Sequence, residues 1–556
     1  MIMSLRNMFP CSRKKPLLAM LAGLWAVNGA FAEEVSGFAD HGNQRIHRIA
    51  EGDTLYDLAA RYLDDATLWP EFLKYNDIRN PKRLRPGTEL RIPPLDLPVI
   101  HVIFALGDVH RVADDDAPSG LVTIGDLLRE SDRVRVGADS YLTLQFDDGS
   151  IMRVLSNSSL QIQRYRMARG AKPQSRVIVL EEGNLDISVT PTGKNKANHF
   201  EVITPQAVAA ARGTRFDVST SDTGTTSGVT EGSVTVRQNL RNRRGSQKLL
   251  KVGEGLRADQ NGRLGAIRPL LAAVDLSMLP SRFTDAGYLV VSWPELENAA
   301  SYQVRLASDH DMHRVVANME PEKPVVKFTG LDDGDYIVGL RAVDAEGIIG
   351  FESTQHIRIE AQPAFPFYLG PANHQATGHK VDLSCTEVQG ASAYRFQLSE
   401  SPDFSSAIVD TVQQDNCRHT VSDLTNGRYF WRVASITTLS DGQQKQGPFS
   451  QPAQFEVADS AVTTHQAPPG VFWLDDRHLE YTAQISSDEN FANIISEQAL
   501  HERSISMDEL SPGRYFIRVQ ARDADGFTTV FSMPRIVTIK PTVQTIERTW
   551  ADKVSN

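Results

Sequence analysis

Two patterns of hydrophobic positions divide the chain into different kinds of structure. Near the N-terminus, Leu55, Leu58, Ala59 and Tyr62 follow the i, i+3, i+4, i+7 spacing that predicts an amphipathic helix. Further on, short runs of alternating or wholly apolar residues, separated by turn sequences, predict an all-β region. These runs are 141–146, 177–180, 184–189 and 233–236. The pattern therefore predicts a multidomain, mainly β protein that begins with a small helical module.

An internal repeat fills about the last 280 residues. Three units each open with a residue suited to a core, continue with a strand led by tyrosine, and close with the motif Leu-x-x-Gly-x-Tyr. The openers are Trp293, Cys385 and Trp473, the strand tyrosines are Tyr302, Tyr394 and Tyr481, and the closing tyrosines are Tyr336, Tyr429 and Tyr515. The spacing between the two tyrosines is 34, 35 and 34 residues. A period near ninety residues predicts units joined like beads on a string rather than a tightly coupled solenoid.

The helical module combines a short strand, two helices and a closing strand within residues 45–94. Gly52 permits a tight turn after the first strand, and Asp53 or Thr54 can cap the first helix. Trp69 and Phe72 lie in the second helix, and Pro-Gly at 86–87 precedes the last strand. This segment resembles a LysM module, a βααβ domain that binds glycans containing N-acetylglucosamine.

The LysM resemblance implies a shallow glycan-binding groove between the first strand–helix loop and the second helix–strand loop. The implied binding residues are Gly52, Asp53, Thr54, Leu55, Asn76, Asp77, Ile78, Arg79 and Pro81. Small loops of this kind expose backbone to the N-acetyl amide, and apolar residues can contact its methyl group. For Asp53 we favour helix capping over direct contact, and packing alone is the alternative role for Ile78. A single shallow site should bind weakly.

The all-β region from 105 to 260 contains several matching segments of another family. They include Phe146-Asp147-Asp148-Gly149-Ser150, Thr204-Pro205 and the run 209–218, with Arg212-Gly213-Thr214 at its centre. The region resembles the FecR domain, which in FecR itself belongs to a membrane-tied sensor that signals to a sigma factor. This chain has no matching cytoplasmic segment or membrane helix, so the resemblance implies the fold and an exported location rather than that regulatory role.

The closing motif of each repeat resembles the tyrosine corner of fibronectin type III-like sandwiches, in which a hydroxyl bonds back to the backbone at a strand corner. We therefore predict three fibronectin type III-like β-sandwiches at 275–360, 361–458 and 459–541, followed by a tail at 542–556.

The first 32 residues read as a secretion signal, with a basic start, an apolar run at 17–27 and the cleavage site Ala30-Phe31-Ala32. The apolar run is short for a membrane span, so we predict cleavage and no membrane span in the mature chain, with an uncleaved membrane anchor as the less favoured alternative. The signal carries four basic and no acidic residues, so its removal leaves 54 Lys and Arg against 69 Asp and Glu. That acidic balance argues against nucleic-acid binding.

Two cysteines remain after cleavage, Cys385 and Cys417 in the middle repeat. Cys385 takes the core tryptophan position of its neighbours, and the alternation of the strand places Cys417 toward the core as well. We predict a structural disulfide in an exported protein, with two free buried thiols as the alternative.

Motifs of catalysis are missing: the sequence has no HExxH, no GxSxG, no phosphate-binding glycine loop and no Cys/His cluster. We therefore expect no catalytic residues, no metal site and no cofactor. The sequence favours a non-catalytic periplasmic protein that binds peptidoglycan and presents β domains to an unidentified envelope protein. One alternative is envelope sensing through the FecR-like domain, and a less favoured one is a cell-wall hydrolase or its activator.

Overall fold

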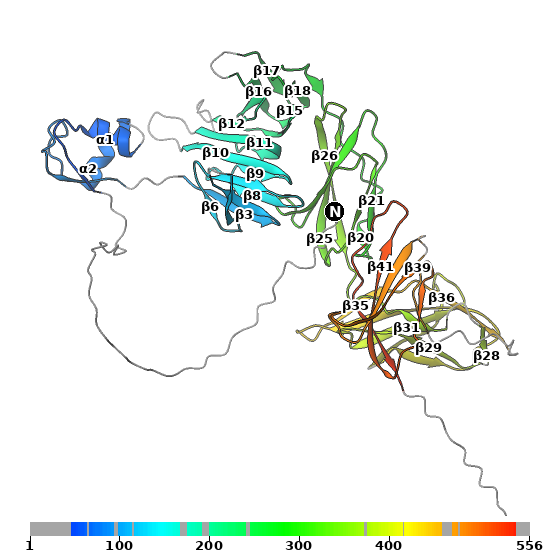
Figure 1. Cartoon of the computed structure of the whole chain (residues 1–556). Helices are drawn as coiled ribbons and strands as arrows, with labels where there is room; N and C mark the ends of the chain where they lie inside the picture. The colour runs from blue at the N-terminus through cyan, green and yellow to red at the C-terminus, as the bar shows by residue number, and fades with distance from the viewer. Residues whose placement is uncertain are drawn as a thin grey trace, which may run out of the picture.

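A computed structural model gives the arrangement of the domains (Figure 1). The predicted signal at 1–32 and tail at 542–556 lie outside the described residues. The structure describes residues 46–63, 66–93, 98–113, 116–166, 175–191, 199–240, 245–371, 375–377, 379–414, 416–458, 470–475, 477 and 479–540. The protein is multidomain and mainly β, as the sequence predicts.

The first module has the predicted βααβ order. Its elements are β1 (Ile46–Arg48), α1 (Leu55–Tyr62), the 3-10 helix η2 (Ala66–Glu71), α2 (Phe72–Tyr75) and β2 (Glu89–Arg91), with β1 antiparallel to β2. Thr54 is the N-cap of α1, because its hydroxyl accepts from the backbone N–H of Asp57. The predicted helical face is confirmed: Leu55, Leu58 and Ala59 are buried in a core with Phe72.

The 17 strands of the FecR-like unit are connected by hydrogen bonds throughout and form two sheets, joined through β11, around one hydrophobic core. Its strands are β3 to β19. Their residue ranges are β3 (Ile100–Leu106), β4 (Val109–Val112), β5 (Pro118–Leu121), β6 (Leu127–Leu128), β7 (Arg133–Val136), β8 (Tyr141–Gln145), β9 (Ile151–Val154), β10 (Ser158–Arg166), β11 (Ser175–Ser188), β12 (His199–Ile203), β13 (Ala207–Ala211), β14 (Arg215–Ser221), β15 (Gly224–Glu231), β16 (Ser233–Gln238), β17 (Gln247–Lys251), β18 (Glu254–Asp259) and β19 (Arg268–Pro269).

Strand β11 belongs to both sheets of this unit. Residues up to Glu182 pair with β10, and residues from Gly183 onward pair with β14. Gly183 has a φ of +100°, and a Cβ built there would lie 2.1 Å from the hydroxyl oxygen of Ser158. Only glycine fits this position, which is where the strand passes from one sheet to the other.

The first sandwich packs a five-stranded sheet, in the order β20-β26-β25-β22-β23, against the pair β21-β24. Its strands are β20 (Arg282–Phe283), β21 (Leu289–Ser292), β22 (Ser301–Ala307), β23 (Val315–Met319), β24 (Val325–Phe328), β25 (Gly334–Val343) and β26 (Ile349–Ile359). Trp293 and Tyr302 lie in its core.

The second and third repeats share strands. The second contributes β27 (Tyr368–Gly370), β28 (Gln375–Thr377), β29 (Val381–Cys385), β30 (Glu387–Val388), β31 (Ala393–Ser399), β32 (Ala407–Gln414), β33 (Arg418–Val421), β34 (Gly427–Thr438), β35 (Gln444–Phe449) and β36 (Ala453–Ala458). The third contributes β37 (Gly470–Phe472), β38 (Glu480–Ser486), β39 (Ile494–Leu500), β40 (Ser504–Ser506), β41 (Gly513–Arg522) and β42 (Arg535–Ile539).

The expectation of separate beads is wrong for these two repeats. Strand β27 of the second repeat pairs with β37 of the third, and β30 pairs with β42, so two sheets each contain strands of both repeats. Phe367, which precedes β27, is buried in the core of the third repeat. Hydrogen bonding and burial both cross this boundary, so neither repeat is a self-contained unit.

The predicted tyrosine corner is present in all three repeats. The hydroxyls of Tyr336, Tyr429 and Tyr515 donate to the carbonyls of Asp332, Thr425 and Ser511, at 3.0, 2.9 and 2.8 Å. Each acceptor lies four residues before its tyrosine. The hydroxyl therefore fixes the entry into the strand that follows the Leu-x-x-Gly-x-Tyr motif.

The predicted disulfide joins Cys385 and Cys417, whose Cα atoms are 5.2 Å apart. Both residues are buried in the core of the second repeat. The bridge closes a separation of 32 residues, so its reduction is expected to lower the free energy of unfolding by about 3–4 kcal/mol in the chain-entropy model. Urea unfolding with and without reductant measures this, and alkylation of the untreated protein at two thiols would contradict the bridge.

The FecR-like unit is docked onto the first sandwich through buried charges. Asp186 on β11 forms ion pairs with Arg305 on β22 and Arg341 on β25, at 2.7 and 2.9 Å. Glu352 on β26 contacts both arginines as well, and Arg305 is only 1% exposed. The two units are therefore held together by an ion-pair cluster instead of a free linker.

Candidate functional site

The predicted glycan-binding loops lie at one end of the first module, and the side chain of Asp53 is engaged there. Its carboxylate accepts from the backbone N–H of Ala50 at 2.7 Å and lies 2.7 Å from Nε2 of His47. His47 in turn lies 2.9 Å from the hydroxyl of Tyr62. The hydrogen bond with His47 and that from Ala50 lower the pKa of Asp53. Asp53 therefore holds the turn before α1 together, while Thr54 caps the helix.

Two other predicted residues also have structural roles. Leu55 is buried in the module core. Asn76 links the end of α2 to β2, because its amide donates to the carbonyls of Phe72 and Arg91 and accepts from the N–H of Arg91 at 2.7 Å. Their side chains are occupied, so these residues can contribute only backbone to a ligand.

The remaining predicted residues keep the two loops open. Gly52, Asp77 and Arg79 are exposed, and Ile78 and Pro81 are half-buried. Ile78 packs against the hydrophobic core of the module, to which Leu55 also belongs. The site that this arrangement offers consists of exposed backbone beside one half-buried apolar side chain.

Two exposed aromatic residues beside these loops were not predicted. Tyr56 follows the first loop and is 55% exposed, and Tyr75 precedes the second and is 40% exposed. Tyrosine rings offer an apolar face together with a polar edge. Tyr56 falls outside the helical stripe of Leu55, Leu58, Ala59 and Tyr62, and this sequence signal could have identified it.

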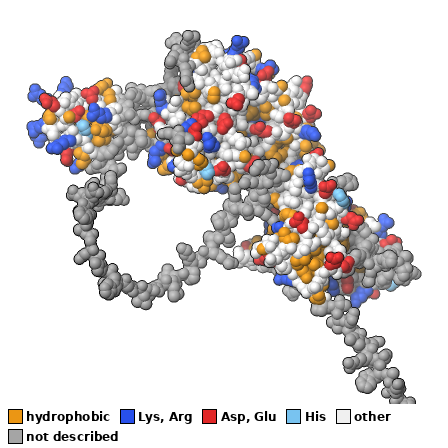
Figure 2. Space-filling view, in the orientation of Figure 1, with side chains coloured by type: hydrophobic (Ala, Val, Ile, Leu, Met, Phe, Trp, Pro, Cys, Tyr) orange, Lys and Arg blue, Asp and Glu red, His pale blue; other side chains and the backbone are white. Residues whose placement is uncertain are grey.

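Basic side chains surround the second loop. Arg79, Lys82, Arg83 and Arg85 are all exposed, and Figure 2 shows Lys and Arg side chains gathered on the first module, in contrast to the mixed charges of the β domains. Such a surface attracts anionic polymers at low ionic strength.

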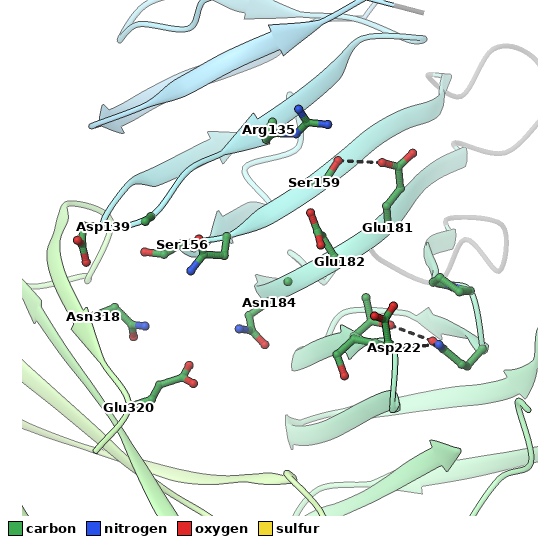
Figure 3. A pocket seen from close by; sticks show the side chains of 17 residues that line it. Arg135, Asp139, Ser156, Ser159, Glu181, Glu182, Asn184, Asp222, Asn318 and Glu320 are labelled. Atoms are coloured by element: carbon green, nitrogen blue, oxygen red, sulfur yellow. Dashed lines mark hydrogen bonds between the residues drawn. The ribbon is translucent and has the colours of Figure 1, made fainter. Parts of the chain in front are cut away.

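A second candidate site is a cleft where the FecR-like unit meets the first sandwich (Figure 3). Its volume is about 740 Å³. The turn residues Asp139 and Asn157, the bend of β11 at Gly183 and the β14–β15 turn at Asp222 form most of the wall, and Glu320 of the sandwich completes it. Sequence analysis could not find this cleft, because it exists only where two units are docked.

The cleft is acidic, and one of its carboxylates is fixed. Glu181 accepts from Arg133 at 2.7 Å and from the hydroxyl of Ser159 at 2.8 Å. Burial alone would raise the pKa of Glu181, but these hydrogen bonds outweigh it and lower that pKa. Asp139, Glu182, Asp222 and Glu320 are exposed around it, against the single basic side chain of Arg135. This surface disfavours anionic ligands.

Two families of binding and regulatory domains match the chain. The LysM domain matches residues 47–93, and the FecR protein family matches residues 132–235. The fibronectin type III-like character of the C-terminal half rests on its sandwich sheets and tyrosine corners. Within the described part of the chain, no helix has both the length and the hydrophobicity required to cross a membrane.

Several solved structures are similar to parts of the chain, and no curated protein matches it. A candidate anti-sigma factor from Parabacteroides distasonis is 18% identical over 25% of this chain, with a TM-score of 0.20, and the chain spans 59% of its length. Three fibronectin domains of chicken CNTN1 cover 47% of this chain and 96% of their own, at 15% identity and TM-score 0.13. Fibronectin(III)-like modules of Clostridium thermocellum CbhA cover 35% and 97%, at 14% identity and TM-score 0.16.

Proposed function

We propose that this protein is exported to the periplasm and tethered to peptidoglycan by its first module, without catalysing a reaction. The LysM match over residues 47–93 is the observation that carries this proposal. The open loops around Gly52 and Ile78, with the exposed Tyr56 and Tyr75 beside them, support glycan contact. The proposal includes three fibronectin type III-like units that present surfaces to an envelope protein.

Sedimentation with purified peptidoglycan tests the tether. The mature chain is expected to pellet with the sacculi, and a chain lacking residues 45–94 is expected to remain in the supernatant. Because one shallow site binds weakly, the bound fraction should rise steeply with the amount of glycan. Equal pelleting of both proteins would defeat the proposal.

Point substitutions can separate the role of the first loop in glycan binding from its role in the stability of the module. Gly52 and Gly87 have φ values of +93° and +86°, and a Cβ at either position would meet no atom within 4 Å. Alanine therefore imposes a similar backbone strain at both, about 1–2 kcal/mol. Gly52→Ala is expected to weaken glycan pelleting several-fold because it alters the exposed loop backbone.

Gly87→Ala is the matched control, since Gly87 lies outside the predicted binding residues. It should lower the thermal midpoint as much as Gly52→Ala does and leave pelleting unchanged. If pelleting with glycan falls equally in both variants, reduced stability of the module explains the loss and the assignment of the loop as a binding site is wrong.

Envelope signalling is the second function that we propose to test, because the FecR family matches residues 132–235. Signalling would require a separate membrane partner. Transcript profiles discriminate the two functions. They are compared between cells with the protein, cells that lack it, and cells that lack it but are supplied with either the wild type or Gly52→Ala. A transcriptional response that the variant restores fully would favour signalling independent of the glycan.

A further inference from the structure

A second cavity, of about 540 Å³ and open to solvent on one side, lies at the point where the three repeats meet. The first sandwich contributes the loop 284–288, the connection before β27 contributes Phe365 and Phe367, and the third repeat contributes Trp473 and Phe531. The cavity size is within the range of small-molecule sites, which are often found between domains.

Several of the residues that line the cavity are aromatic. Phe367 and Trp473 lie with ring centroids 5.7 Å apart, and Tyr288, Phe365, Phe449 and Phe531 line the same space. Arg535 fixes one side, because its Nε donates to the carbonyl of Phe365 at 2.8 Å while its guanidinium lies 4.8 Å from the ring of Phe367.

The cavity is held open by contacts between repeats. Lys327 on β24 pairs with Asp523 of the third repeat at 2.5 Å, and Lys445 of the second pairs with Asp333 of the first at 2.8 Å. The backbone N–H of Val530 also donates to the hydroxyl of Thr329 at 2.9 Å. A ligand would therefore enter a preformed space and would not have to order loops, which lowers the cost of binding.

The charge of Arg477 at this cavity is neutralised by two carboxylates. Arg477 lies 2.7 Å from Asp475 and 3.0 Å from Asp285, and its guanidinium stacks 4.6 Å from the ring of Tyr288. An anionic ligand would compete with two carboxylates already bound to this arginine. The electrostatics favour a neutral ligand.

Two polar atoms of residues that line the cavity have no hydrogen-bond partner among the described residues, Nε1 of Trp473 and the hydroxyl oxygen of Tyr481. Trp473 is only 5% exposed. An unpaired buried donor costs free energy that an acceptor on a ligand would recover. Nε1 of Trp293, at the same repeat position, is unpaired as well, so an unpaired indole alone does not indicate a binding site. The cavity and its aromatic residues indicate the site, and the indole N–H indicates that the ligand carries a hydrogen-bond acceptor.

We propose that this cavity binds a neutral, flat, mainly apolar small molecule that carries a hydrogen-bond acceptor. The site is independent of the glycan-binding loops. Its ligand stacks on the aromatic residues and accepts from Trp473.

Titration of the mature chain with Prodan, a neutral naphthyl ketone with environment-sensitive fluorescence, tests the site. A saturable blue shift is expected for the wild type. Ala521→Phe fills the space from β41 and should weaken binding at least tenfold, and Trp473→Phe, which keeps a ring and removes the N–H, should weaken it several-fold. Ala492→Phe adds the same ring at an exposed alanine of the same repeat and should bind as the wild type does.

Ala364→Leu fills the cavity with a smaller side chain. It replaces Ala521→Phe if that variant shows no cooperative thermal unfolding and is therefore not folded. Undiminished binding in the folded filling variants would place the probe elsewhere and overturn the proposal. Absence of saturable probe binding by the wild type would also overturn the proposal. That result is expected if the cavity holds only water or serves as a contact surface for a partner protein.

Discussion

Asp186→Asn is expected to lower the free energy of unfolding of the FecR-like unit and the first sandwich by about 3–5 kcal/mol, the cost of breaking a buried ion pair. The side chain of Asp186 is only 4% exposed. Its removal leaves Arg305 and Arg341 with Glu352 as their remaining carboxylate partner, and Arg153, 3.8 Å from Asp186, loses that neighbour.

The protonation of Asp186 is consistent with this role. Burial alone would raise the pKa of its carboxyl, but the positive charges of Arg341 and Arg305, with smaller contributions from Arg153 and Arg215, hold that pKa well below its ordinary value. The aspartate is therefore charged at neutral pH and pairs with arginines across the interface.

Urea unfolding followed by tryptophan fluorescence measures the change, since Trp293 lies in the core of the first sandwich. Asp335→Asn is the matched control. Asp335 is 56% exposed on the same sandwich and pairs with His356 at 3.0 Å, and an exposed pair contributes at most about 1 kcal/mol. Equal losses in the two variants would mean that the cluster does not hold the units together.

A second large effect is expected from pH, through Asp217 on β14. This residue is 3% exposed, and its Oδ2 has no hydrogen-bond partner among the described residues. Burial raises its pKa from 3.8 to about 7, and the arginines nearby only partly offset that rise. Asp217 lies beside Gly228 of β15, whose position also approaches the carbonyl of Ile349 in the first sandwich.

Between about pH 4 and pH 7 the folded protein therefore keeps a proton on Asp217, whereas the same carboxyl in the unfolded chain has already lost its proton. Stability from this group is fully present below pH 4 and is lost as the pH rises through 7. Between pH 8 and pH 5 the wild type should gain roughly 2–3 kcal/mol from it. Glu352, whose pKa is lowered to about 2, does not titrate in that window.

Asp217→Asn is expected to remove this dependence, because an amide carries no charge at any of these pH values. Burial lowers the pKa of His313 at the same interface, and that group works in the opposite direction because it loses stability as the pH falls. The informative quantity is therefore the difference between the unfolding free energies of wild type and variant at each pH. A difference that stays constant from pH 5 to pH 8 would contradict the assignment.

Local structure could be predicted from the sequence because it depends on near neighbours. The helical spacing of 55–62, the cap at Thr54 and the Cys385–Cys417 pairing each follow from a spacing or a strand alternation that the chain itself carries. The tyrosine corners and the βααβ fold of residues 45–94 were implied by the resemblance of these segments to fibronectin type III-like sandwiches and to the LysM module.

Contacts between units could not be predicted, because outward-facing positions look alike whether water or another domain covers them. Arg305 and Asp186 occupy polar positions in alternating strands, which indicates exposure, and each is buried only because the other unit supplies its counter-charge. The pairing of β27 with β37 across the boundary between two repeats could not be predicted from the sequence for the same reason. The acidic cleft and the aromatic cavity arise from those contacts and were missed with them.

The shared strands and the buried ion pairs also determine how the molecule carries mechanical load. If one end is anchored on the wall and a partner pulls on the other, force that enters at β3 passes through the Asp186 cluster into the first sandwich. The ion pairs of Lys327 and Lys445 carry it from there to the second and third repeats, whose strands are paired with one another up to β42. Flexible interdomain joints would absorb such a pull by reorienting. Here the β domains should transmit it as a stiff strut, so tension would be felt first at the weakly held glycan loops.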